Sequence, residues 1–338
     1  MSSKNDRIVV RLMSQRGPTS FEDLRRFMPG GSLEHDGVLF TTADDVPADV
    51  VVVVNYLKYD TRVSAKRGYV WNWHNEPIVR QPFAKGYDRV FTHVTSSRDP
   101  RVRNAPPILN WWVNKTYDEL EKMQAPPKTK SMSAIASTKT NIKGHRLRNE
   151  FIGSLEEEFP AIDVFGHGRS KELSDKWEGL APYRYSLAIE NTSAPHYWTE
   201  KIVDCFLAFT VPVYFGATNI GDYFPEGSYI WLPLNQPAES RKTLENVLRE
   251  DSWDNRFPAV LEARRRVLEN YSLYGQLSTL VRNEETQIRH APRRTSRVNG
   301  RRTRKGGWIR GLGVTGNVGA WARRRNTRLH SRASALAS

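Results

Sequence analysis

The sequence of 338 residues predicts an α/β protein with two doubly wound domains, each built on a parallel sheet. Three observations support this prediction. Short apolar or β-branched runs recur along the chain, as in parallel strands that are covered on both faces. Amphipathic stretches alternate with these runs. A proline-containing stretch without periodicity, residues 124–130, separates two series of such elements.

The first series defines an N-terminal domain, residues 1–125. Its expected strands are 8–12, 50–54, 68–73 and 89–94. Between the first two strands, a helix that begins at Ser20 is expected, since serine is a favoured N-cap residue. The five consecutive valines of 50–54 indicate a strand that is buried on both faces.

The second series follows a linker, residues 126–132, and defines a domain over residues 133–290. The expected strands are 133–137, 161–165, 185–189 and 211–215, and the expected helices are 146–159 and 199–209. A long, partly broken helix is predicted from 257 to about 289. It is long enough to pack back across the first domain.

The positive charge of the chain is concentrated at its C-terminal end. Residues 291–338 hold 13 of the lysines and arginines and no acidic residue, so the net charge of +14 leaves about +1 for residues 1–290. We expect this basic tail to be disordered on its own. Its tryptophans, Trp308 and Trp321, lie among the cations and favour binding to an anionic membrane surface. Binding to nucleic acid and an inert, solubilising role remain alternatives, and no specific nucleic acid is expected.

The composition also bears on the compartment. Cys205 is the sole cysteine and has no partner for an internal disulfide. No apolar run approaches the roughly 20 residues of a membrane-spanning helix. The start of the chain, Met1–Arg7, lacks the apolar region of a signal peptide. These features predict a cytoplasmic, bacterial protein, which the tail would make peripheral on the inner face of the membrane.

The stretch Tyr183–Lys201 carries the most informative pattern. It is predicted to be a buried strand, a polar loop with Asn191 at the carboxyl end of the strand, and a helix that begins near Thr199. A helix N-terminus attracts anions, and Lys201 adds a positive charge there. Glu200 has two oxygens that can accept hydrogen bonds from the hydroxyls of a ribose. The pattern suits the binding of a nucleoside diphosphate. Taken without the rest of the pattern, Glu200 and Lys201 are charges that are ordinary at the start of a helix.

A series of motifs around this stretch resembles the signature of glycosyltransferase family 10, the α-1,3/1,4-fucosyltransferases. The matching segments run in order along the chain and are Ile162–Gly168, Tyr183–Tyr185, Ala188–Asn191, His196–Tyr197, Thr199–Lys201, Phe209–Val213 and Phe224–Ile230. Weaker similarity extends over most of residues 50–285. The resemblance implies a GT-B fold, with two Rossmann-like domains and a ligand cleft between them, and an inverting transfer from GDP-fucose.

The resemblance also implies roles for residues of the second domain. Lys201 resembles a cation that binds the diphosphate, and Glu200 resembles the ligand of the ribose. Tyr197 and Asn191 resemble residues that line the sugar-phosphate. These four residues are the predicted donor site, together with a second phosphate-binding cation at the start of the helix after the first strand of this domain.

Two arginines are candidates for that second cation. Arg148 matches the family position best, and Arg146, two residues earlier, is the alternative. With two cations and a helix terminus beside the leaving diphosphate, no cofactor is required. A divalent metal is expected at most to stimulate the reaction, because the sequence holds no cluster with metal-ligand spacing.

The candidate base lies in the first domain, in the segment after the strand 68–73. An inverting transfer needs a base that takes the proton of the acceptor hydroxyl. The family places a glutamate here, commonly before Ser-Pro, and Glu76 precedes Pro77 without the serine. His74 is the competing base, because its unperturbed pKa suits the task. Trp73 is a candidate for stacking on an acceptor sugar, or else a core residue.

Two residues of the polar loop between the strand and the helix, residues 190–199, here called the donor loop, depart from the family pattern. His196 stands where the family often has aspartate, and Trp198 stands where it has a smaller apolar residue. The donor is therefore expected to be GDP-fucose or a related GDP-sugar. The expected acceptor is an oligosaccharide or a lipopolysaccharide-type glycan, and a nucleic-acid-binding protein is the alternative from another class.

Overall fold

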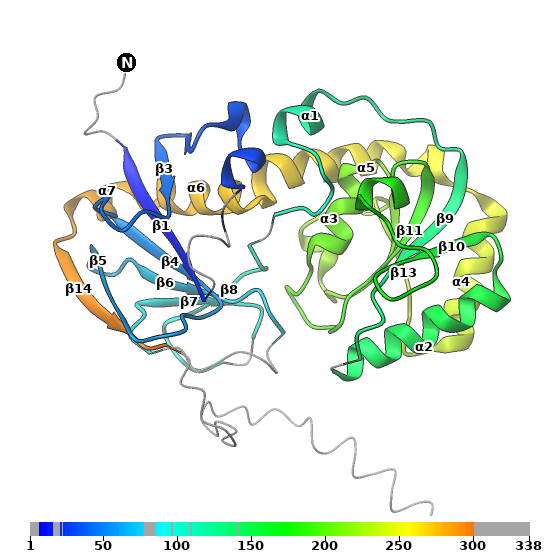
Figure 1. The fold of residues 1–338 in the computed structure, drawn as a ribbon, viewed down its shortest axis with the longest axis horizontal. Coiled ribbons are helices and arrows are strands. Elements are labelled where there is room, and N and C mark those ends of the chain that lie inside the picture. Colours follow the sequence, from blue (N-terminus) through cyan, green and yellow to red (C-terminus); the bar gives the residue numbers. More distant parts are fainter. Residues whose placement is uncertain are drawn as a thin grey trace, which may run out of the picture.

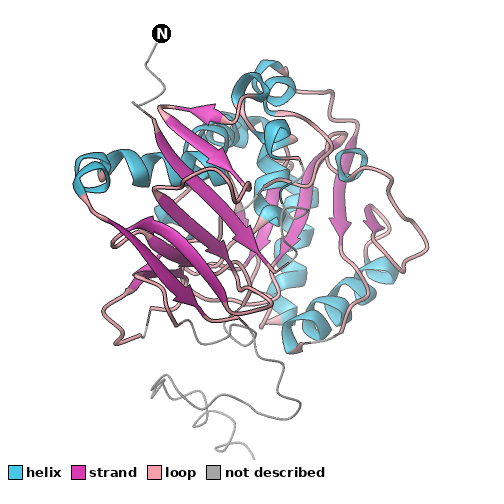
Figure 2. Cartoon of the chain, turned by 60° about the vertical axis from the view of Figure 1, so that its left-hand side comes forward, coloured by secondary structure: helices cyan, strands magenta, loops and turns pink. Residues whose placement is uncertain are grey.

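The computed structural model describes residues 7–300, apart from 16–20, 22, 78–84, 96, 109 and 141. Two α/β units lie side by side, one around a seven-stranded sheet and one around a five-stranded sheet (Figure 1). Helices lie between and around the two groups of strands (Figure 2). The predicted α/β class with two Rossmann-like domains in a GT-B arrangement is confirmed.

The sheet of the first domain is parallel except at one edge. Its order is β2-β3-β1-β4-β6-β7-β8, and only β2 runs antiparallel to its neighbour. The central strand β4 is the run of five valines, whose side chains alternate between two separate apolar clusters. The four strands expected from the sequence are confirmed. The bounds are β1 Ile8–Ser14, β2 Glu34–His35, β3 Val38–Thr41, β4 Val50–Val54, β6 Val70–Trp73, β7 Arg89–Thr92 and β8 Val102–Asn104.

The helix expected after Ser20 is not an α-helix in the structure. A 3₁₀ helix, Leu24–Phe27, is followed directly by a second short one, Pro29–Gly31. Gly30 adopts a positive φ of 60°, which breaks any regular helix there. Ser20 lies outside the described residues. The one α-helix of this region among the described residues, α1 (Tyr117–Lys122), has a capping box formed by Thr116 and Glu119.

The sheet of the second domain is parallel throughout. Its order is β10-β9-β11-β12-β13, so β9, the first strand of this domain along the chain, lies inside the sheet. The strands and helices predicted for this region are confirmed with shifts of a few residues at their ends. The bounds are β9 Lys130–Ile135, α2 Lys143–Glu158, β10 Ile162–Phe165, β11 Tyr183–Ile189, α3 Glu200–Leu207, β12 Val211–Phe215, β13 Ile230–Trp231 and α4 Pro237–Glu250.

The predicted long helix is a chain of helical segments that returns to the first domain (Figure 1). The segments are α5 Trp253–Arg266, a π-helical turn Val267–Tyr271, α6 Leu273–Asn283 and α7 Glu285–His290. Within α6, the hydroxyl of Tyr274 donates to the Leu24 carbonyl at 3.0 Å. Glu284 pairs with Arg89 of β7. The expected packing across the first domain is confirmed.

The start of the predicted disordered tail is ordered, which corrects that prediction for residues 291–300. Strand β14, Arg293–Val298, pairs antiparallel with β5, Thr61–Lys66. Three of its arginines form ion pairs with first-domain aspartates: Arg293–Asp49 at 2.8 Å, Arg294–Asp88 at 2.7 Å and Arg297–Asp60 at 2.9 Å.

One apolar contact and one close approach hold β14 beside β5. Val298 is fully buried in the apolar cluster that also contains Val63 and Ala65 of β5. Gly86 faces β14 so closely that an added Cβ would lie 2.2 Å from the Arg297 carbonyl oxygen. The remainder of the basic tail, residues 301–338, lies outside the described residues.

None of the helices in the described part of the chain combines the length and the apolar character needed to cross a membrane.

Candidate functional site

The candidate site lies where the carboxyl ends of strands from both sheets meet. In the first domain, His74 follows β6 and His93 follows β7. In the second domain, Asn191 follows β11 closely, and the loop to α3 carries Tyr197. The rings of His93 and Tyr197 lie 4.8 Å apart, so the two domains touch here. Ligands of parallel α/β sheets bind at this edge.

The start of helix α2 lies against Asn191. An added Cβ at Gly144 would lie 1.8 Å from the Asn191 carbonyl oxygen, so only glycine permits this approach. The Asn191 side chain accepts a hydrogen bond from the Tyr197 hydroxyl at 3.1 Å. In the described part of the chain, no side chain caps this end of α2. Its free N–H groups and dipole therefore face the same region as Asn191 and Tyr197, as an anion site requires.

Lys201 is held by three oxygens at the start of α3. Its Nζ donates to Glu190 Oε2 at 3.0 Å, to Thr199 Oγ1 at 2.9 Å and to Glu200 Oε1 at 3.3 Å. Burial favours the neutral amine, but the carboxylates of Glu190 and Glu200 outweigh it and raise the pKa of Lys201. The ammonium group therefore stays charged and fixed, with its side chain 21% exposed.

Glu190 holds Thr199 and Lys201 in place at the start of α3. Its fully buried carboxylate accepts hydrogen bonds from the backbone N–H of Thr199 and from the Thr199 hydroxyl, both at 2.7 Å. Glu190 thereby fixes the residue that caps α3, since Thr199 in turn accepts from the Lys201 N–H. The carboxylate links the end of β11 to the helix start.

Glu200 carries a negative charge beside Lys201. Burial alone would raise the pKa of this carboxyl, but the ammonium groups of Lys201 and Lys176 outweigh it and lower the pKa to about 2. Lys176 is itself paired with the buried Asp204 at 2.6 Å. Glu200 is therefore ionised at neutral pH and can only accept hydrogen bonds, as a ligand of ribose hydroxyls must.

The two candidate arginines of α2 have different surroundings. Arg148 is buried, and its Nη2 donates to the Ser137 carbonyl at 3.2 Å. Its Nε has no hydrogen-bond partner among the described residues. Burial lowers the pKa of Arg148, while Glu190 and Glu200 act in the opposite direction, which places its charge near theirs. Arg146 is exposed and donates to the Thr140 carbonyl at 3.2 Å.

Glu76 and His74 differ in exposure at the first-domain side of the site. Glu76 is exposed in the segment after β6, and His74 is buried. His74 Nε2 and Asn72 Oδ1 share a hydrogen bond of 2.7 Å. Burial raises the pKa of Tyr197, and the charges of Glu190 and Glu76 raise it further. The Glu76 carboxylate therefore lies near the loop of the second domain that carries Tyr197.

The structure corrects the predicted acceptor role of Trp73. Its side chain is 3% exposed, stacks on Phe91 at 4.3 Å and donates through Nε1 to the Pro106 carbonyl at 2.9 Å. A ring that is covered on both sides cannot stack on a sugar. The alternative left open by the sequence, a core residue, is the one observed, because the central strand β6 is buried on both faces.

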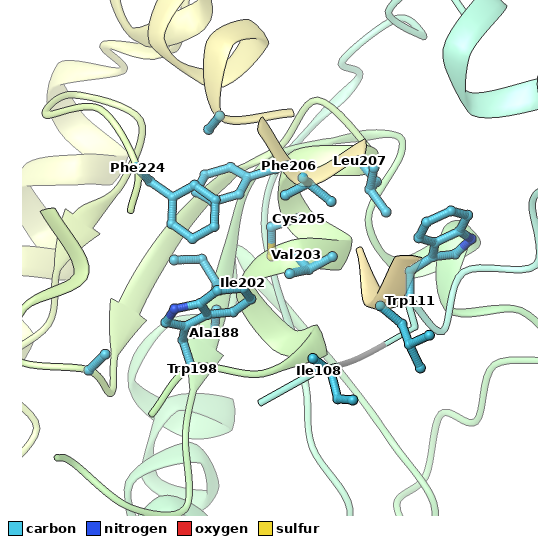
Figure 3. Packing of buried hydrophobic residues seen from close by; sticks show 14 of the residues in the cluster. Ile108, Trp111, Ala188, Trp198, Ile202, Val203, Cys205, Phe206, Leu207 and Phe224 are labelled. Atoms are coloured by element: carbon cyan, nitrogen blue, oxygen red, sulfur yellow. The ribbon is translucent and has the colours of Figure 1, made fainter. Parts of the chain in front are cut away.

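The two departures from the family pattern also have different surroundings. Trp198 is fully buried and packs edge-on against Phe224 at 5.4 Å, in the cluster around α3 (Figure 3). It is therefore a core residue of the second domain. His196 has a positive φ of 62°, and its Nδ1 bonds to the Tyr223 hydroxyl, so its ring is fixed within the loop.

Sequence reasoning gave no role to three residues of the site: Gly144, Glu190 and His93. Glu190 lies inside the motif Ala188–Asn191, and a lone glutamate at the end of an apolar strand is the signal that could have identified it. Gly144 and His93 gave no local signal, because each matters through a contact with a residue that lies far away in the sequence. Among the described residues, no group of three or more His, Cys, Asp or Glu side chains is arranged to hold a metal ion.

Comparison with known families agrees with the motifs. The family model described as glycosyltransferase family 10 (fucosyltransferase) C-term matches residues 125–257. Residues 125–257 are therefore similar to glycosyltransferase family 10. The matched residues contain β9 to β13 and every donor-site residue predicted for the second domain.

Curated relatives match parts of the chain. A putative fucosyltransferase-like protein of Arabidopsis thaliana is 31% identical over 155 residues, which are 45% of this chain and 28% of that protein. An α-(1,3)-fucosyltransferase of Helicobacter pylori is 32% identical over 89 residues, 25% of this chain and 18% of the relative. Mouse 4-galactosyl-N-acetylglucosaminide 3-alpha-L-fucosyltransferase 9 is 28% identical over 186 residues, 52% of this chain and 49% of the relative. The chain thus spans less than half the length of each of these relatives.

Solved structures of similar fold include a crystal structure of an α1,3-fucosyltransferase. It aligns with a TM-score of 0.49 at 15% identity and covers 81% of this chain and 93% of that one. A crystal structure of an α1,3-fucosyltransferase with GDP-fucose aligns with a TM-score of 0.48, also at 15% identity, over 80% and 94% of the two chains. The likeness to family 10 rests on the sequence match over residues 125–257.

Proposed function

We propose that the chain is an inverting glycosyltransferase that moves fucose from GDP-fucose to a hydroxyl of a glycan. The observation that carries the proposal is that Arg148 of α2 lies near enough to Glu200 for their charges to interact, while Glu200 pairs with Lys201 at the start of α3. All three residues lie inside the segment that matches family 10. Two cations and a ribose-type acceptor, together with the N–H groups at the start of α2, suit a nucleoside diphosphate. A related GDP-sugar is the second candidate donor, favoured by the departure at His196.

Within this proposal, the two cations have different tasks. Lys201 is saturated by three oxygens, so it contributes a fixed positive charge at the start of α3. Arg148 has an Nε without a partner among the described residues, so it is the group that has donors available for a phosphate oxygen. Charges that are already in place stabilise the leaving diphosphate without rearrangement. We therefore propose that transfer needs no bound metal or other cofactor.

Glu76 is the proposed general base. As the acceptor oxygen forms its bond to C1 of the sugar, the C1–O bond to GDP breaks and the bonding electrons leave with the diphosphate. The proton of the acceptor hydroxyl passes to Glu76. The exposed position of Glu76 opposite Tyr197 supports this role. The buried His74, whose Nε2 is engaged with Asn72, is the second candidate.

The acceptor and the location remain proposals as well. An oligosaccharide or lipopolysaccharide-type glycan is the proposed acceptor class. The basic residues of 301–338 are proposed to bind an anionic membrane surface, which would hold the protein peripherally on the cytoplasmic side. A nucleic acid is not the expected partner of this tail.

A thermal-shift panel tests the proposed donor. A ligand that binds only the folded chain raises its melting temperature by mass action. GDP and GDP-fucose should raise it, whereas UDP, CMP and their sugars should leave it unchanged. A shift with UDP compounds alone would overturn the proposal, and a larger shift with another GDP-sugar than with GDP-fucose would identify the second candidate donor.

A further inference from the structure

His93 is a buried histidine at the domain boundary that the proposed mechanism does not use. It follows β7 directly, and its side chain is 2% exposed. Neither Nδ1 nor Nε2 has a hydrogen-bond partner among the described residues. A phenylalanine would fill the same space, so packing alone does not account for an imidazole there.

The chemical state of His93 narrows what it can bind. Burial lowers its pKa to about 4, and the neighbouring charges of His74 and His196 act in the same direction. The ring is therefore neutral at pH 7, with one nitrogen that donates a hydrogen bond and one that accepts. A buried polar group without a partner costs free energy, typically about 1–3 kcal/mol per group. A partner that both donates and accepts would recover that cost.

The surroundings of His93 place that partner at the donor loop. Its ring lies 4.8 Å from the ring of Tyr197, at an angle of 60° between the planes. The Tyr197 hydroxyl is already engaged, because it donates to Asn191 Oδ1. The imidazole thus faces the loop that follows β11, at the point where the first domain reaches the proposed donor site.

We propose that His93 hydrogen-bonds hydroxyl groups of the sugar carried by the donor. A sugar hydroxyl both donates and accepts, which matches the two nitrogens of a neutral imidazole. The Tyr197 ring lies 4.8 Å from the imidazole, so binding of the sugar to His93 requires this side chain to move. The inference rests on the proposed function, and it assigns the sugar moiety to a residue of the first domain, whereas the nucleotide is held by the second.

This division predicts a difference between two ligands. GDP lacks the sugar and should not depend on His93. GDP-fucose should bind more tightly through the imidazole, and this part of its affinity should vanish when the nitrogens are removed. The matched variant is His93→Phe, which keeps an aromatic ring against Tyr197 and loses both nitrogens. His93→Gln restores one donor and one acceptor.

Calorimetric titration of GDP and GDP-fucose into the full chain tests the inference. His93→Phe should bind GDP like the wild type and bind GDP-fucose about tenfold more weakly, as expected for a lost hydrogen-bonding group. His93→Gln should recover part of the preference for GDP-fucose. A melting curve shows whether each variant is folded, and His93→Leu replaces His93→Phe if that variant does not fold.

Three results would overturn the inference. In the first, His93→Phe binds both ligands like the wild type. In the second, it weakens GDP and GDP-fucose equally, which indicates a structural effect on the nucleotide site. In the third, His93→Gln loses as much preference as His93→Phe. A wild-type chain that binds neither GDP nor GDP-fucose refutes the proposed function itself and this inference with it, so the two failures are distinguishable.

Discussion

The two domains assemble their parts of the site in different ways. In the second domain, Asn191, Glu200 and Lys201 come from one short stretch, and Glu190 in the same stretch holds them together. In the first domain, Glu76 and His93 follow two different strands, β6 and β7. A compact motif can be read from the sequence, whereas a site assembled from distant segments becomes visible only in the fold.

The largest expected effect tests the role of the first domain in the chemistry. Glu76→Gln keeps the size of the side chain and loses its affinity for a proton. Turnover should fall by about 10² to 10⁴, the usual contribution of a general base, while GDP binding should survive because the proposed nucleotide site lies in the other domain. Initial rates with GDP-fucose and an acceptor, together with a GDP titration, measure both.

A Glu76→Gln enzyme with near-normal turnover would remove this residue from the mechanism. His74→Ala would then be the next variant to assay. In that case, the first domain would contribute a buried histidine to the chemistry in place of an exposed carboxylate.

The next effect tests how far the first domain depends on the end of the chain. A chain that ends at residue 290 loses β14 and the burial of Val298, which alone contributes about 1.5–3 kcal/mol. A chain that ends at residue 300 keeps both. We expect the shorter chain to lose about 3 kcal/mol of unfolding free energy relative to the longer one in urea titrations.

The same two truncated chains distinguish the contribution of β14 from that of residues 301–338. The chain that ends at 300 should match the full chain in stability and activity and should lose binding to anionic liposomes. Equal stability of the two truncated chains would show that β14 is dispensable, and undiminished liposome binding would refute the proposed membrane role of residues 301–338.

A smaller effect concerns the contact between the domains at His93. Its folded-state pKa of about 4 lies below the usual 6.5, so the unfolded chain binds the proton more readily. Stability from this group is therefore complete above pH 6.5 and declines as the pH falls toward 4. By pH 4.5, the wild type should have lost about 2 kcal/mol more unfolding free energy than His93→Phe, measured against pH 7. Parallel pH profiles of the two proteins would contradict a neutral, buried His93.

The smallest effect tests the close packing behind Asn191. Gly144→Ala places a methyl group against the Asn191 backbone and should weaken GDP binding about tenfold, since overpacking costs typically about 1–3 kcal/mol. Gly153→Ala is the matched control on the same helix, because an added Cβ there meets nothing within 4 Å. The control should bind GDP normally and gain up to about 1 kcal/mol in stability. Equal GDP affinities of the two variants would show that this contact does not shape the site.

Much of the fold could be predicted because its signals are local. The valines of β4 and the alternation of strands and helices in the second domain require no knowledge of distant contacts. The helix after Ser20 failed because a Pro-Gly-Gly sequence at 29–31 outweighs the preceding helical pattern. Strand β14 escaped prediction because six residues rich in arginine become a strand only beside the acidic side chains and the open edge near β5.

The candidate site, like the fold, could be predicted from the sequence only where its signals are local. Its second-domain residues could be named from order and spacing along one stretch. The burial of Trp73, the closeness of Gly144 to Asn191 and the position of His93 follow from how the sheets and domains pack. No short window of the sequence carries that information.

The central claim is that the second domain binds a GDP-sugar through Arg148 and Lys201. The GDP affinity of Arg148→Ala, compared with Arg146→Ala on the same helix, tests it most directly. Loss of a charge-assisted hydrogen bond should weaken GDP binding about tenfold or more in Arg148→Ala, while Arg146→Ala, whose guanidinium is exposed, should bind like the wild type. A normal GDP affinity of Arg148→Ala together with a loss in Arg146→Ala would contradict the account.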